Sequence, residues 1–140
     1  MQYAKVDEKI IIRLKQIVGS ANVLTDPDTL ENYSHDETPL YSSLPEAVVR
    51  CASTEQVSQV MQVAHENLIP VTPRGGGTCL SAGAVPAHGG IVLSLEKMTK
   101  ILEIDKDNMM VVVETGIVTE QLGKELTKHG LFFPPDPVSI

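Results

Sequence analysis

The chain has 140 residues, a hydrophobic fraction of 42% and a formal net charge of -7, which is enough apolar material for one buried core. Because phosphate backbones are bound by clustered Lys and Arg, and no such cluster occurs, this acidic chain is not expected to bind nucleic acid. No apolar run could span a bilayer and the first residues lack a signal-peptide core, so we expect a cytoplasmic protein. The two cysteines lie in unlike surroundings, so we expect no disulfide framework.

The first 45 residues predict an N-terminal helical arm. Apolar residues recur at helical spacing over residues 7–18, with Asp7 as N-cap and Gly19 as the stop. Asp26 and Pro27 are typical of the start of a second, short helix that runs to Tyr33. The polar stretch from there to residue 45 has no clear periodicity, so we interpret it as a connection.

Residues 46–73 predict a strand, a helix and a second strand. The apolar run 47–52 is typical of a buried strand, and Ser53 with Gln56 matches a helix capping box. An apolar stripe continues over residues 57–68, and residues 70–73 form a second extended segment. A crossover helix of this length favours two parallel strands.

Three further strands and one helix are predicted after residue 90. The strands cover residues 91–95, 101–105 and 109–115, and the turn at 106–108 favours a hairpin of the last two. Thr119 is the expected cap of a helix that Gly130 closes. The whole pattern indicates an α+β fold, with residues 46–140 forming one domain after the arm.

The chemistry is expected in the glycine-rich loop that follows the second strand. Residues 74–84 contain four glycines, which accept positive φ angles and let successive amides converge on an anion. Thr78 and Ser81 add hydroxyl donors. The alternative is a flexible connector, but four side chains of the loop look packed rather than solvated, namely Leu80, Ala82, Ala84 and Val85. We therefore predict that the loop holds a phosphate or pyrophosphate.

Two better-known nucleotide motifs are absent, and no other site stands out. Gly77 is followed by Thr78 and Cys79 rather than by the Lys of a Walker loop, and Leu80 stands where a Rossmann fingerprint needs its third glycine. The segment 35–37, His-Asp-Glu, has no histidine at ligand spacing, so a metal site is not predicted. Cys79 is interpreted as a small loop residue rather than a redox-sensitive thiol, because no neighbouring base would activate it.

The segment 70–81, PVTPRGGGTCLS, closely resembles the phosphate loop of FAD-linked oxidases of the glycolate oxidase flavin subunit and D-lactate dehydrogenase type, which share the vanillyl-alcohol oxidase/p-cresol methylhydroxylase (PCMH) fold. The resemblance continues through GIVLSL, ILEID, ETGI and FPPDP, and it covers residues 47–140 in order. It implies a PCMH-type FAD-binding domain with a small parallel β-α-β subdomain, an antiparallel sheet and FAD between them.

The same resemblance implies the cofactor-binding residues. The loop would wrap the FAD pyrophosphate, and residues near the end of the chain would lie near the flavin or its ribityl chain. Because no His lies between Arg74 and Ser81, non-covalent FAD is expected. The full set is Arg74, Gly75, Gly76, Gly77, Thr78, Ser81, Pro135, Asp136 and Ser139.

The resemblance also implies that the chain is a truncated N-terminal piece. The cap domain with the substrate groups would follow, so no catalytic residue is predicted in these 140 residues. The full-length protein would oxidise a 2-hydroxy acid such as glycolate or D-lactate, and an iron-sulfur or other electron-transfer subunit would be its partner and could hold it at the membrane periphery. Uncovered apolar surface favours a homo-oligomer. The alternative is a non-catalytic nucleotide-binding or scaffold module without redox chemistry.

Overall fold

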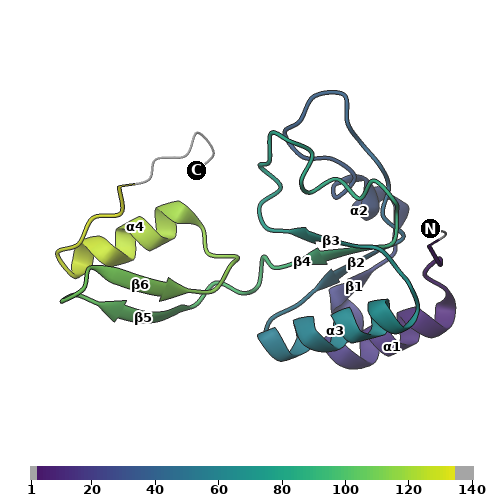
Figure 1. Cartoon of the computed structure of the whole chain (residues 1–140), viewed down its shortest axis with the longest axis horizontal. Helices are drawn as coiled ribbons and strands as arrows, with labels where there is room; N and C mark the ends of the chain where they lie inside the picture. Colours follow the sequence, from purple (N-terminus) through teal and green to yellow (C-terminus); the bar gives the residue numbers. More distant parts are fainter. Residues whose placement is uncertain (1–2, 135–140) are drawn as a thin grey trace. The chain divides into compact units, whose positions relative to one another are not determined.

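The computed structural model describes residues 3–134 and divides into two compact units, residues 1–97 and 98–140. Figure 1 shows the elements of both units. The first unit holds a four-stranded sheet and most of the helices, and the second holds a hairpin and one helix. In chain order the elements are α1 (Glu8–Val18), a 3-10 turn (Ser20–Asn22), β1 (Val23–Leu24), α2 (Pro27–Glu31), β2 (Ala47–Arg50), α3 (Thr54–Glu66), β3 (Val71–Arg74), β4 (Ile91–Ser94), β5 (Ile101–Asp105), β6 (Met110–Val113) and α4 (Thr119–Lys128).

The sheet of the first unit has the strand order β1-β2-β4-β3. Strands β2 and β3 are parallel, as predicted, but they are not neighbours, because β4 lies between them and is parallel to both. The edge strand β1 pairs antiparallel with β2, with Val23 opposite Val49. A strand inside the N-terminal arm was not predicted, since two residues are too few to show alternation.

The two faces of this sheet bury different layers, in keeping with the two-residue period of a strand. Helices α1 and α3 cover one face, and α2 covers the other (Figure 1). On β4, Ile91 and Leu93 belong to the larger layer, while Val92 packs with Val48 and Leu30 under α2. The larger layer comprises Ile10, Leu14, Val18, Val23, Val49, Cys51, Val60, Val63, Ala64, Ile69, Ile91 and Leu93.

The helix N-termini follow the predicted residues at three places, Asp7, Asp26 and Ser53, and depart at the fourth. Asp7 caps α1 by accepting from the amide of Ile10 at 2.9 Å. Ser53 caps α3, but Gln56 reaches back to the amide of Ala52 rather than of Ser53. At α4 the predicted cap is wrong: Thr119 is already the first helical residue, and Val118 occupies the cap position without a side-chain bond.

The second unit consists of the β5-β6 hairpin and α4. The hairpin is antiparallel, as predicted, and contains a bulge between Ile101 and Glu103. Leu122 and Leu126 of α4 are buried. Across residues 3–134 no helix is both long and apolar enough to cross a membrane. The two compact units divide after Lys97. The expected domain boundary between residues 45 and 46 stays a prediction.

Candidate functional site

The glycine-rich loop begins at the carboxyl end of β3 and leads back to the start of β4. The carboxyl ends of the parallel strands β2, β3 and β4 lie at one edge of the sheet, which is the edge where open α/β sheets bind ligands. Residues 75–90 contain no helix, in keeping with their glycines and Pro86. The loop therefore meets the ligand side of the sheet with irregular backbone.

The backbone amides at the tip of this loop are available to a ligand. Among the hydrogen bonds of residues 3–134, none is donated by an amide of residues 75–81. Apart from buried Gly77, these residues are exposed. A Cβ built on Gly75 would meet no atom within 4 Å, and one on Gly76 would meet only the Thr78 methyl group at 3.8 Å. Open space and unpaired donors together suit an anion that approaches the backbone closely.

The side chain of Arg74 turns back onto the N-terminal arm. Its Nη1 donates to the carbonyl oxygen of His35 at 2.6 Å and its Nη2 to that of Asn32 at 3.4 Å. The guanidinium also lies 5.4 Å from the centre of the Tyr33 ring, a cation-π distance. Burial and the nearby Glu96 carboxylate raise the pKa of Tyr33, whose hydroxyl donates to Glu96 at 3.2 Å.

Gly77 fits this arrangement for two reasons. Its φ is +75°, which side chains other than glycine rarely adopt. A Cβ at Gly77 would also overlap the guanidinium of Arg74. The glycine therefore leaves the space through which the Arg74 side chain reaches the arm.

The second half of the loop is held by Asp36 and Thr38. Asp36 is 7% exposed, and its carboxylate accepts from the amides of Thr38 at 2.9 Å and of Ala84 at 3.1 Å. The Thr38 hydroxyl accepts from the amide of Ala82 at 2.6 Å and donates to the carbonyl of Cys79 at 3.4 Å. Burial alone raises the pKa of Asp36, but these hydrogen bonds and the charge of Arg74 outweigh it and lower that pKa.

The structure brings six of the predicted site residues together and leaves three undecided. Arg74, Gly75, Gly76, Gly77, Thr78 and Ser81 lie in one loop. Pro135, Asp136 and Ser139 lie outside the described residues.

The expected packing of the loop is right at Ala84 and Val85, which are buried, but wrong at Leu80, which is 74% exposed because it lies at the solvated tip. Sequence reasoning also missed the role of Asp36. Its signal was the Thr two residues later, since an Asp side chain often accepts from that amide in a turn.

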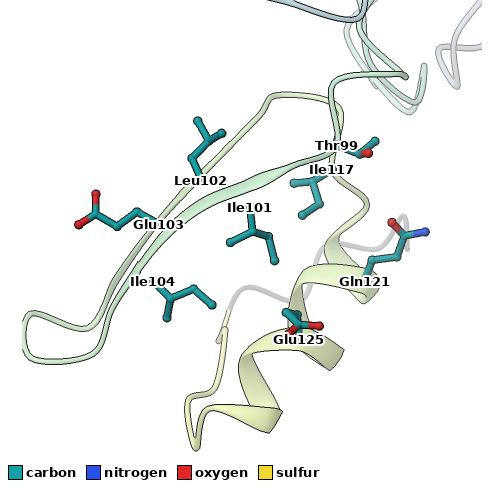
Figure 2. A pocket seen from close by; sticks show the side chains of 8 residues that line it. All are labelled: Thr99, Ile101, Leu102, Glu103, Ile104, Ile117, Gln121 and Glu125. Atoms are coloured by element: carbon teal, nitrogen blue, oxygen red, sulfur yellow. The ribbon is translucent and has the colours of Figure 1, made fainter.

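A groove of about 510 Å³ lies in the second unit, between the hairpin and α4. Figure 2 shows Ile101, Ile104 and Ile117 pointing into it, while Leu102 points to the opposite face. The hydrogen bond and charge of Lys128 lower the pKa of the lining Glu125, so this carboxylate is ionised and already paired. Within the described residues no group of His, Cys, Asp or Glu could hold a metal ion. The groove therefore has a mixed lining, in which Thr99, Glu103, Gln121 and Glu125 stand beside the apolar side chains.

The fold and the loop are typical of one class of protein: a domain with a parallel sheet whose carboxyl edge carries a glycine-rich loop suited to an anionic cofactor. Residues 45–140 match the protein-family model described as FAD binding domain. The chain therefore belongs to this family, and the predicted resemblance is confirmed.

Known relatives and one solved structure agree with this assignment. The chain is 42% identical over 137 residues to a protein named D-lactate dehydrogenase in Anaerostipes hadrus, covering 97% of this chain and 29% of that protein. It is 41% identical over 108 residues to glycolate oxidase subunit GlcD of Bacillus subtilis, covering 77% and 23%. The structure of p-cresol methylhydroxylase with substrate bound superimposes with a TM-score of 0.72 at 26% identity, covering 88% and 25%. The chain thus spans less than a third of these proteins.

Proposed function

We propose that the loop Arg74–Ser81 binds the pyrophosphate of FAD, as the cofactor-binding part of a flavin-dependent dehydrogenase or oxidase of 2-hydroxy acids. The observation that carries this proposal is the run of unpaired amides over residues 75–81, all of which are exposed except Gly77. A pyrophosphate offers several anionic oxygens, and convergent amides are the donors that suit them. The hydroxyls of Thr78 and Ser81 add two more donors at the same tip. Pro135, Asp136 and Ser139 are proposed to lie near the flavin or its ribityl chain.

The residues that the structure describes fit this cofactor. The glycines at 75 and 76 leave room beside the backbone, and within residues 3–134 their amides have no acceptor that would compete. The segment 74–81 has no histidine, so we propose that FAD is bound without a covalent link. When bound, FAD supplies the acceptor for the hydride that such enzymes remove from their substrate. The loop would fix its position and neutralise its phosphate charge.

The substrate class comes from the relatives. The names D-lactate dehydrogenase and glycolate oxidase subunit both denote enzymes of small 2-hydroxy acids. We propose the same class for the whole protein, with glycolate or D-lactate as the first substrates to test. The word subunit in one name also favours an electron-transfer partner, such as an iron-sulfur protein. Binding to such a partner would hold the enzyme at the membrane periphery.

Gly75→Ala and Gly123→Ala form a matched pair that tests the loop. A Cβ would meet no atom within 4 Å at either glycine, so neither change disturbs the protein's own packing. At Gly75 the added methyl group would occupy space that we assign to the pyrophosphate, and we expect FAD affinity to fall by about tenfold or more, which is about 1.4 kcal/mol. At Gly123, inside α4, the same change should leave affinity unaltered.

The measurement is a titration with FAD followed by flavin fluorescence, on this chain and on the native polypeptide that contains it. Saturable binding that Gly75→Ala weakens and Gly123→Ala does not would support the proposal. Equal affinity in both variants would exclude the loop tip as the pyrophosphate site. Binding without oxidation of any 2-hydroxy acid by the native polypeptide would leave a nucleotide-binding module in place of an enzyme.

A further inference from the structure

We infer that the segment Asn32–Thr38 of the N-terminal arm is a clamp that sets the conformation in which residues 75–81 bind the cofactor. The inference deepens the proposed function and rests on it. We call this segment the arm clamp. The arm clamp lies before residue 45, where the match to the FAD binding domain begins. Its hydrogen bonds nevertheless reach both ends of the glycine-rich loop. Asp36, Thr38 and Arg74 are therefore positioning residues.

The arm clamp holds the first end of the loop through Arg74. Two backbone carbonyls of the clamp, those of Asn32 and His35, accept from the guanidinium, and the Tyr33 ring lies beneath it. Arg74 is the last residue of β3 and lies opposite Ser94 of β4 in the sheet, so its backbone is held by the pairing with β4. A side chain anchored at both its backbone and its guanidinium cannot swing freely. We therefore assign Arg74 to shaping the loop, with the amides of residues 75–81 contacting the phosphate oxygens.

The second end of the loop is held by Asp36 and Thr38. Each of the two Asp36 carboxylate oxygens accepts one amide, one from Thr38 in its own turn and one from Ala84 in the loop. The Thr38 hydroxyl completes the contact at Ala82 and Cys79. Amides shielded from water need acceptors, and these two side chains provide them at Ala82 and Ala84. The exposed amides of the tip stay unpaired.

Because the amides of Ala82 and Ala84 are paired and those of residues 75–81 are not, a ligand meets only the donors of residues 75–81. Without the arm clamp, the amides of Ala82 and Ala84 would lose their acceptors, and the loop could rearrange to satisfy them within itself. The unpaired amides of residues 75–81 would then no longer be held together. The arm clamp thus raises affinity without touching the ligand, because less conformational freedom is lost when the ligand binds.

Four variants test the arm clamp. Asp36→Asn replaces one acceptor oxygen by an NH₂ group that faces an amide, and Glu37→Gln makes the same charge change at an exposed neighbour. Thr38→Val removes the hydroxyl at nearly constant shape, and Thr38→Ser keeps it. We expect FAD affinity to fall about tenfold in Asp36→Asn and Thr38→Val, and to stay within about twofold of the unchanged protein in the other two.

Two readouts separate this inference from the proposed function. The first is FAD affinity by flavin fluorescence, on this chain and on the native polypeptide that contains it. The second is amide hydrogen exchange without FAD, where Asp36→Asn and Thr38→Val should speed exchange at residues 82 and 84 while the α3 amides stay protected. That second readout needs no cofactor, and it distinguishes a local loosening of the loop from general unfolding.

The outcomes are distinct. Weaker FAD binding with faster local exchange in Asp36→Asn and Thr38→Val, restored in Thr38→Ser, would support the arm clamp. If the unchanged protein binds FAD and Asp36→Asn binds it as well as Glu37→Gln does, the arm clamp is refuted and the proposed function stands. If the unchanged polypeptide binds no FAD, the proposed function is refuted, and so is the role of the arm clamp in FAD binding, whatever the exchange rates show.

Discussion

Replacing Gly77 by Ala should uncouple the loop from the arm. The residue has a φ of +75°, and its new Cβ would overlap the guanidinium of Arg74. The Arg74 side chain must therefore leave its place, which breaks its 2.6 Å hydrogen bond to the carbonyl of His35 and its contact with the Tyr33 ring. The variant thus combines a backbone penalty with the loss of a charge-assisted contact.

The size of the effect follows from these two parts. A left-handed conformation costs an ordinary residue about 1–2 kcal/mol. Losing a hydrogen bond from a charged group costs about 1–2 kcal/mol at a site that water can reach. We expect Gly77→Ala to lower the free energy of unfolding of the first unit by about 2–4 kcal/mol. In an Arg74→Ala background the guanidinium is gone, so only the backbone part should remain.

Tyrosine fluorescence during urea unfolding measures this loss in the first unit alone, because all three tyrosines lie before residue 98 and the chain has no Trp. A double-mutant cycle with Gly77→Ala and Arg74→Ala should give a coupling energy of about 1–2 kcal/mol. If Gly77→Ala costs the same in both backgrounds, Arg74 does not cross the Gly77 position and our reading of the loop is wrong.

Three further outcomes are expected. Gly89→Ala and Gly90→Ala share a positive φ, but only at Gly90 would the Cβ overlap a backbone oxygen, so Gly90→Ala should cost about 1–3 kcal/mol more in urea unfolding; equal costs would contradict the close approach. A thiol reagent at pH 8 should label Cys79, which is exposed, and not Cys51, which is buried and whose pKa burial raises to about 11; two labelled thiols in the folded protein would count against this. The pKa of Asp36 lies below its ordinary value of 3.8, so the Asp36 carboxylate stabilises the fold fully above pH 3.8 and loses this effect as the pH falls further. The difference in unfolding free energy between the unchanged protein and Asp36→Asn should therefore shrink below about pH 3.8, and a difference that stays constant there would refute the role of the charge.

Periodicity was sufficient to predict most of the fold. The continuous apolar run of β4 and the apolar stripe of α3 are strong signals, and both elements lie where they were expected. The insertion of β4 between β2 and β3 was not predicted, since a local pattern marks a segment as a strand but does not identify its neighbours in the sheet. β1 was missed because pairing with β2, rather than its own two residues, makes it a strand.

The candidate site was predictable in its location and not in its support. Glycines after a strand, together with the family resemblance, indicated the loop at residues 74–84. The hydrogen bonds of Asp36 and Thr38 join positions more than 40 residues apart, and no local pattern reports such a contact. For the same reason the segment 33–45 was interpreted as a connection.

The charge distribution is consistent with our proposal that the loop binds through its backbone. Arg74 is the only Lys or Arg between residues 51 and 96, and its guanidinium donates to carbonyls of the arm. A phosphate at the tip would therefore meet amide dipoles rather than a mobile cation. Dipoles bind an anion well only when they are already oriented, because reorienting them on binding would cost free energy. An acidic chain can bind an anionic cofactor in this way, provided that Asp36, Thr38 and Arg74 keep the loop in shape beforehand.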